Sequence, residues 1–88
     1  MTTIPDEALK QIERLRWQCR RGMLELDVLL GAFLDQTYAS LEPRLQRQFI
    51  RLLELPDPVI HAWCIGGEVP EDEAYGELLA LIRRTRPA

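Results

Sequence analysis

Apolar residues recur along this 88-residue chain at the three- and four-residue spacing of amphipathic helices. Five segments show the pattern: about residues 6–19, 23–38, 41–53, 58–65 and 71–84. Prolines or glycines separate all of them except the second and third, which Ala39-Ser40 separates. No segment alternates with the period of two that a half-buried strand requires. We therefore predict an all-α fold, a compact bundle of about five short helices in one domain (1–88), ordered over about 6–84 with frayed ends.

The second segment is apolar on more than one side. Its main stripe contains Met23, Leu26, Leu29, Leu30, Phe33, Leu34 and Thr37. Its second stripe contains Val28 and Ala32 with Glu25 as the polar boundary, and Leu24 and Gly31 lie beside it. Two explanations remain open. Either this helix is central and surrounded by others, which is the simpler interpretation, or one face is left exposed for a partner.

Caps and helix breakers mark the boundaries. We expect Ser40 to be the N-cap of the third helix, with Pro43 in its first turn. We expect Asp57 to be the N-cap of the fourth helix and Pro58 its first residue. The pair Gly66-Gly67 should end that helix, since neither a Walker lysine nor a Gly-x-Gly-x-x-Gly pattern makes it a phosphate cradle.

Charge and composition limit the functions to consider. Hydrophobic residues are 47% and charged residues 28% of the chain, which is typical of a folded domain, and the net charge of -3 disfavours general nucleic-acid binding. The row Arg44, Arg47 and Arg51 is either a solvated helix face or a contact for RNA or an acidic partner. Neither a membrane-length apolar run nor a leader pattern is present, so we expect a cytoplasmic chain without membrane insertion.

Candidate catalytic and metal-binding groups are few. Cys19 and Cys64 lie far apart inside apolar patterns, which favours buried free thiols over a disulfide or redox pair. His61 and Cys64 supply at most half of a metal site, so no metal is expected. Without a nucleophile–base arrangement or a nucleotide fingerprint, we expect no enzyme activity.

The stretch Arg20-Arg21-Gly22-Met23-Leu24-Glu25-Leu26-Asp27 combines cations, a glycine and carboxylates where one helix should stop and the next begin. Gly22 should turn the chain with a positive φ. Arg21 and Glu25 could form an ion pair if the helix is continuous between them. Trp17, just before this stretch, should pack beneath a neighbouring helix or serve as an exposed anchor for a partner. A charged corner with no further role remains the alternative.

At this corner the sequence resembles a known family. Trp17, Arg20 and the run Arg21-Gly22-Met23-Leu24-Glu25-Leu26-Asp27 are similar to the Arg-Gly-x-x-Glu motif of the succinate dehydrogenase flavinylation factors, the SdhE-type FAD assembly factors. Phe49-Ile50-Arg51-Leu52-Leu53-Glu54, followed by Asp57-Pro58 and Trp63, resembles the second block of that family. The resemblance extends from about Arg14 to Trp63.

The resemblance implies a five-helix assembly factor that binds the flavoprotein subunit of succinate dehydrogenase, and in bacteria also of fumarate reductase, and promotes covalent attachment of FAD. Because the chain lacks cofactor-binding chemistry of its own, we expect no FAD bound by the factor itself, and we expect a monomer. The partner-binding residues that the resemblance implies are Arg20, Arg21, Gly22, Glu25 and Asp27, and less securely Trp17 and Asp57. Val59 departs from the family, because many relatives have an acidic residue there.

Two other classes of function stay open. Some relatives have been described as the antitoxin half of a toxin–antitoxin pair. A nucleic-acid-binding module that uses the arginine row of the third helix is the second, although the net charge speaks against it.

Overall fold

The computed structural model describes residues 6–87 of the chain, with side chains from residue 11 onward. This part of the chain contains five α-helices, two short 3-10 helices and no strand: α1 (Asp6–Gln18), α2 (Leu24–Gln36), η1 (Tyr38–Ser40), α3 (Pro43–Leu53), α4 (Asp57–Cys64), η2 (Glu73–Tyr75) and α5 (Gly76–Arg84). The all-α prediction is confirmed. The fraying predicted for the ends beyond about 6–84 stays a prediction, and residues 1–5 and 88 of those ends lie outside the described residues. Within residues 6–87, no helix has the length and apolar character to cross a bilayer.

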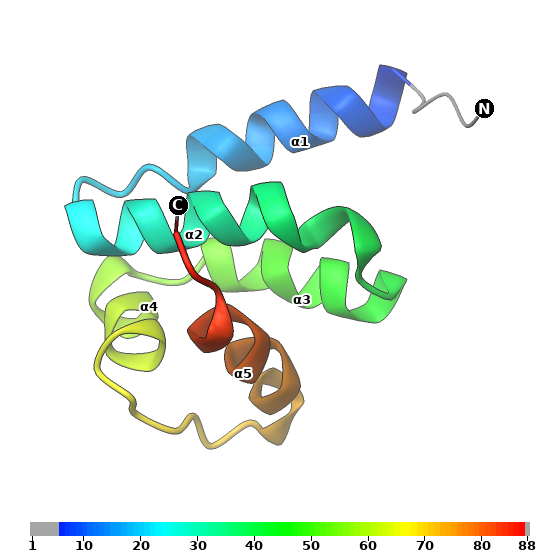
Figure 1. Cartoon of the computed structure of the whole chain (residues 1–88). Coiled ribbons are helices and arrows are strands. Elements are labelled where there is room, and N and C mark those ends of the chain that lie inside the picture. The colour runs from blue at the N-terminus through cyan, green and yellow to red at the C-terminus, as the bar shows by residue number, and fades with distance from the viewer. Residues whose placement is uncertain (1–5, 88) are drawn as a thin grey trace.

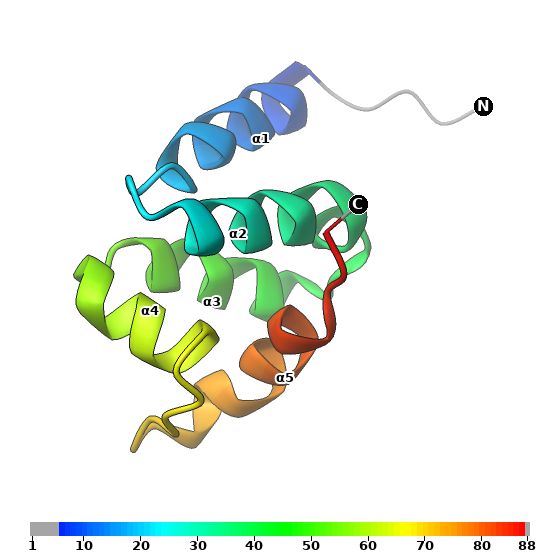
Figure 2. The same cartoon turned by 60° about the vertical axis from the view of Figure 1, so that its left-hand side comes forward.

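The helices form two groups (Figure 1). α2 lies between α1 and α3 in both views, and α4 and α5 lie on the side of α2 and α3 that faces away from α1 (Figure 2). The segment after α5 returns along α2, where Gln36 Nε2 donates a hydrogen bond to the carbonyl of Arg86 at 3.0 Å. This arrangement leaves the α1–α2 connection at one end of the molecule, next to the start of α4.

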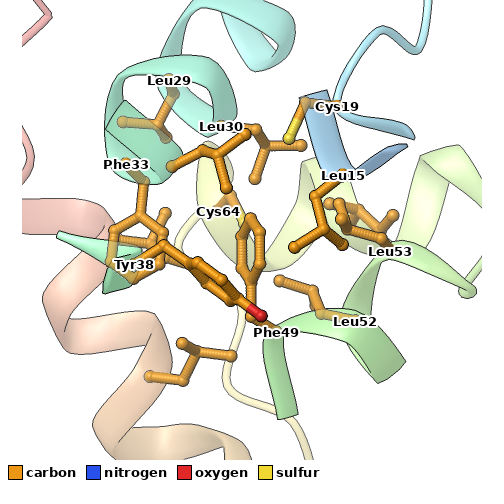
Figure 3. Packing of buried hydrophobic residues seen from close by; sticks show 14 of the residues in the cluster. Leu15, Cys19, Leu29, Leu30, Phe33, Tyr38, Phe49, Leu52, Leu53 and Cys64 are labelled. Atoms are coloured by element: carbon orange, nitrogen blue, oxygen red, sulfur yellow. The ribbon is translucent and has the colours of Figure 1, made fainter. Parts of the chain in front are cut away.

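The core is formed by leucines around three aromatic rings (Figure 3). The ring centroid of Phe49 lies 5.2 Å from that of Phe33 and 5.6 Å from that of Tyr38, and all three side chains are buried. Offset and tilted rings at these distances attract each other beyond the simple burial of their area. Contacts among these three rings therefore hold α2, η1 and α3 together in the core.

α2 buries one face and exposes part of the other. Leu26, Leu30 and Phe33 are fully buried, whereas Leu24 is 81% and Val28 46% exposed. The simpler interpretation, in which neighbours surround the helix on all sides, is therefore wrong for the second stripe. That stripe is open at the N-terminal half of α2, which extends past the end of α1 (Figure 1).

Two predicted caps are wrong by one or two residues. Ser40 belongs to η1, where its hydroxyl donates to the carbonyl of Thr37 at 2.8 Å, and Glu42 precedes α3 instead. Pro43 is the first residue of α3, as expected. At α4 the N-cap position is held by Pro56, so that Asp57 is itself helical. In both places a proline with a fixed φ sets the first turn without a side-chain cap.

The last helix also begins later than predicted. Asp72 accepts a hydrogen bond from the amide of Ala74 at 2.9 Å, which stabilises η2, and α5 starts only at Gly76. Tyr75, the last residue of η2, is half-buried. Asp72 therefore caps a 3-10 turn rather than the α-helix.

Both cysteines are buried free thiols, as predicted. Burial raises the pKa of Cys19 to about 12, although the nearby guanidinium of Arg16 acts in the opposite direction. Burial likewise raises the pKa of Cys64 to about 11, against a weaker opposing effect of Arg83. The thiols therefore stay protonated near neutral pH, where a thiolate would be needed for nucleophilic chemistry.

Candidate functional site

Residues 19–23 connect α1 to α2 and turn sharply at Gly22. The φ of Gly22 is +82°, which confirms the predicted left-handed turn. An ion pair between Arg21 and Glu25 would require a continuous helix. At Arg21, α1 has already ended and α2 has not begun, so the expected pair is not formed.

The side chain of Arg21 instead forms four hydrogen bonds within the protein. Its Nε donates to Asp57 Oδ1 at 2.7 Å, and its Nη1 donates to the carbonyls of Gln18 at 2.8 Å and Leu53 at 2.9 Å. Its Nη2 donates to the carbonyl of Leu55 at 3.2 Å. We call this arrangement the Arg21 clamp. It joins the C-terminal ends of α1 and α3 to the N-terminal end of α4. The positive charge of Arg21 thus lies at the C-terminal ends of helices and the negative charge of Asp57 at an N-terminal end, which are the ends where the helix dipole favours each sign.

Asp27 holds the same loop from the side of α2. Its Oδ1 accepts from the backbone amide of Arg21 at 2.7 Å, and its Oδ2 accepts from the amide of Gly22 at 3.1 Å. Successive amides that point to one side form a concave anion-binding site, which the carboxylate of Asp27 fills here. The loop is thus fixed at its backbone by Asp27 and at a side chain by Asp57.

Three other predicted site residues lie on the surface. The side chain of Trp17 is 70% exposed, so the prediction that it packs beneath a neighbouring helix is wrong and the exposed alternative holds. The guanidinium carbon of Arg20 lies 4.8 Å from the centroid of the indole ring, a cation–π distance. Glu25 is exposed in the first turn of α2, where the helix dipole favours a carboxylate.

An open groove of about 470 Å³ lies between the end of α1 and the start of α2. It is lined by Arg16, Cys19, Arg20, Gly22, Asp27, Val28 and Gly31. A second open hollow of about 460 Å³ shares Asp27, Val28 and Gly31 with the first and continues along α2 to Asp35 and Pro87. The groove is therefore lined by two arginines, one carboxylate and apolar atoms, including those of the exposed Val28.

The structure thus brings all seven predicted site residues to one corner but divides them into two kinds. Trp17, Arg20, Gly22 and Glu25 are exposed, whereas Arg21, Asp27 and Asp57 are half-buried. Their assignment as partner-binding residues stays a prediction. Sequence reasoning did not select Leu24 and Val28 as site residues, although their place on or beside the second apolar stripe of α2 was the signal for them.

The structure offers less support for nucleic-acid binding by the arginine row or for a metal site. Arg44 of the arginine row is paired with Glu42 at 3.1 Å and with Glu77 at 2.6 Å, so part of that row is neutralised. Within residues 6–87, no cluster of three or more His, Cys, Asp or Glu could hold a metal ion. The α1–α2 corner is therefore the best-formed candidate site in the described chain.

Comparison with known proteins identifies the family to which this corner belongs. Residues 13–86 match the family described as flavinator of succinate dehydrogenase, a span that includes every residue of the corner. The chain belongs to this family. The flavinator family match covers both predicted motifs, so the resemblance stated from the sequence is confirmed.

Individual relatives agree with the flavinator assignment. The chain is 49% identical over 74 residues to the FAD assembly factor SdhE of Idiomarina loihiensis, covering 84% of this chain and 82% of the relative. It is 47% identical over 75 residues to the FAD assembly factor SdhE of Shewanella oneidensis, covering 85% and 92%. The corresponding protein of Coxiella burnetii is 38% identical over 72 residues, covering 82% and 88%. No solved structure matches the chain.

Proposed function

We propose that this flavinator family member is a cytoplasmic, monomeric assembly factor for the flavoprotein subunit of succinate dehydrogenase. It docks on that subunit through the α1–α2 corner and promotes covalent attachment of FAD to it. The observation that carries the proposal is the exposed set of Trp17, Arg20, Gly22 and Glu25 on and beside a loop that is fixed from both sides, inside the span that matches the family. The flavoprotein subunit of fumarate reductase is a second client of the same kind.

The factor acts by positioning and not by chemistry of its own. Both its thiols are buried with raised pKa values, and its exposed corner offers charges, an indole and an open groove rather than a nucleophile with a base. FAD stays with the client. Contact at the corner holds the client in the conformation that aligns its flavin with the acceptor histidine, and such alignment accelerates a reaction by removing the entropic cost of orientation.

Docking at the corner is tested by a matched pair of glycine variants. Gly22 and Gly67 both have a positive φ (82° and 75°), both are exposed, and a Cβ at either meets no atom within 4 Å. Gly22→Arg places a long side chain on the proposed docking surface, whereas Gly67→Arg places the same side chain on the loop after α4. Backbone strain is thus equal in the two variants, and only the location differs.

The measurement is covalent FAD on the flavoprotein subunit, read as the mass gain of the denatured subunit. It is made in cells that lack this gene and carry wild type, Gly22→Arg, Glu25→Ala or Gly67→Arg. We expect wild type and Gly67→Arg to restore the mass gain, Glu25→Ala to restore it in part, and Gly22→Arg to fail while remaining folded by circular dichroism. Full flavin attachment without the gene, or equal restoration by both arginine variants, would refute the proposal.

A further inference from the structure

We propose that Arg21, the arginine of the Arg-Gly-x-x-Glu motif, is a positioning residue that shapes the docking corner through Asp57 and does not itself contact the client. This inference rests on the proposed function. It assigns contact to the exposed residues Trp17, Arg20 and Glu25 and assigns the clamp to Arg21. The contact residues are exposed to solvent, whereas the side chain of Arg21 points into the protein.

The hydrogen-bonding capacity of Arg21 is nearly exhausted inside the protein. A guanidinium has five N–H donors, one on Nε and two on each Nη. The Arg21 clamp uses four of them, on Asp57 and on three main-chain carbonyls. Recognition of a client carboxylate by arginine takes two parallel N–H groups, and only one remains.

The position of the side chain supports the same assignment. The side chain of Arg21 is 17% exposed, compared with 48% for Arg16 on the neighbouring helix. Arg20 and Gly22 line the groove between α1 and α2, but Arg21, which lies between them in the sequence, does not. Arg21 therefore points away from the groove, towards α3 and α4.

The clamp determines where the exposed residues lie. Through Gln18 it fixes the end of α1, one residue after Trp17, and through Asp57 it fixes the start of α4 against the same loop. Asp27 binds the amides of Arg21 and Gly22 and so orients the loop relative to α2 and Glu25. Loss of the clamp would free the loop and spread the exposed contact residues over many orientations, which costs binding affinity through lost preorganisation.

Lysine cannot replace Arg21 in this arrangement. A lysine keeps the charge but presents one ammonium instead of a planar fork with donors in several directions. Arg21→Lys therefore breaks the clamp without changing net charge. Asp57→Asn weakens it from the other side, because an amide oxygen can still accept from Nε but no longer carries a charge. Arg83→Lys is the matched control, because Arg83 also donates to main-chain carbonyls, those of Trp63 and Glu68 at the end of α4.

The test is a double-mutant cycle measured as the dissociation constant of the purified flavoprotein subunit. We expect Arg21→Lys and Asp57→Asn each to weaken binding about tenfold, and the double variant to be no weaker than the weaker single variant, because both act on one clamp. The losses of affinity caused by Arg20→Ala and Asp57→Asn should instead multiply in the double variant, since Arg20→Ala removes a contact and Asp57→Asn disturbs positioning. Arg83→Lys should leave binding unchanged.

A second readout is amide hydrogen exchange at Gly22 in the free protein. Exchange should accelerate in both Arg21→Lys and Asp57→Asn, and it should stay unchanged in Arg83→Lys. Multiplying losses for Arg21→Lys and Asp57→Asn, or weakened binding by Arg21→Lys without faster exchange at Gly22, would overturn the positioning role. Failure of the wild-type chain to bind the subunit would instead refute the proposed function.

Discussion

Gly22 and Gly67 adopt almost the same backbone conformation in two different loops, with φ values of 82° and 75°. The left-handed region is open to glycine but costs a residue with a Cβ about 1 to 2 kcal/mol. Because a Cβ at either site would meet no atom within 4 Å, the cost of a small side chain there is conformational and not steric.

Gly22→Ala and Gly67→Ala should therefore each lower the free energy of unfolding by about 1 kcal/mol, with equal effects within error. Urea denaturation of the two variants beside wild type provides the measurement. A much larger loss for Gly22→Ala would mean that the loop tolerates no rearrangement around Asp27, whose carboxylate binds the adjacent amides.

The ion-pair partner of Arg21 could not be predicted from the sequence. Helical spacing points to Glu25 as its partner, four residues away, but the carboxylate that Arg21 contacts is Asp57, 36 residues away. Local spacing cannot identify such a contact, because it depends on how α4 packs against the α1–α2 loop. The glycine turn, by contrast, follows from the chemistry of one residue and is confirmed.

Among the helices, α2 combines a buried and an exposed apolar face. Leu26 is fully buried, whereas Leu24, two residues earlier on the same helix, is 81% exposed. The hydrophobic effect stabilises the fold in proportion to the apolar area removed from water, so these two leucines contribute very differently.

Leu26→Ala should cost about 2 to 5 kcal/mol of unfolding free energy, and Leu24→Ala should change it by less than about 0.5 kcal/mol. Thermal or denaturant unfolding of both variants measures the difference. Since both substitutions remove the same atoms from the same helix, helix propensity cancels between them. A comparable loss in Leu24→Ala would contradict the exposed position of that side chain.

The five main helices could be predicted from periodicity, and their ends only in part. Pro43 does start α3, whereas Ser40 is not its cap. A serine before a helix and a serine within a 3-10 turn have the same local sequence features, and the carbonyl of Thr37 that binds the Ser40 hydroxyl decides between them. Which face of α2 is open depends on the path of α1, which periodicity does not specify.

In the molecule as a whole, both thiols belong to one continuous core that all five main helices share. Burial raises the pKa of Cys19 to about 12 and that of Cys64 to about 11, from an ordinary value of 9.0. Burial also raises the pKa of Tyr38. At alkaline pH the unfolded chain therefore releases protons that the folded chain retains.

The sign of the pH dependence follows from this difference. Stability from each thiol is fully present below about pH 9 and is lost as the pH rises to about 11 for Cys64 and about 12 for Cys19, with a slope of about 1.4 kcal/mol per pH unit for each thiol. Urea denaturation at a series of pH values from 8 to about 11 measures the slope. In the Cys19→Ala/Cys64→Ala variant the slope should fall to the contribution of Tyr38, and an unchanged slope would contradict the assignment.

The environments of the two tryptophans differ in a way that makes the protein its own optical reporter. Trp17 is 70% exposed beside Arg20 at the corner, whereas Trp63 is half-buried with its ring centroid 5.3 Å from that of Tyr75. An exposed indole emits at longer wavelength and is open to a soluble quencher, and a shielded one is not. Occupation of the corner therefore has an intrinsic fluorescence signal at Trp17, while Trp63 supplies an internal reference from α4.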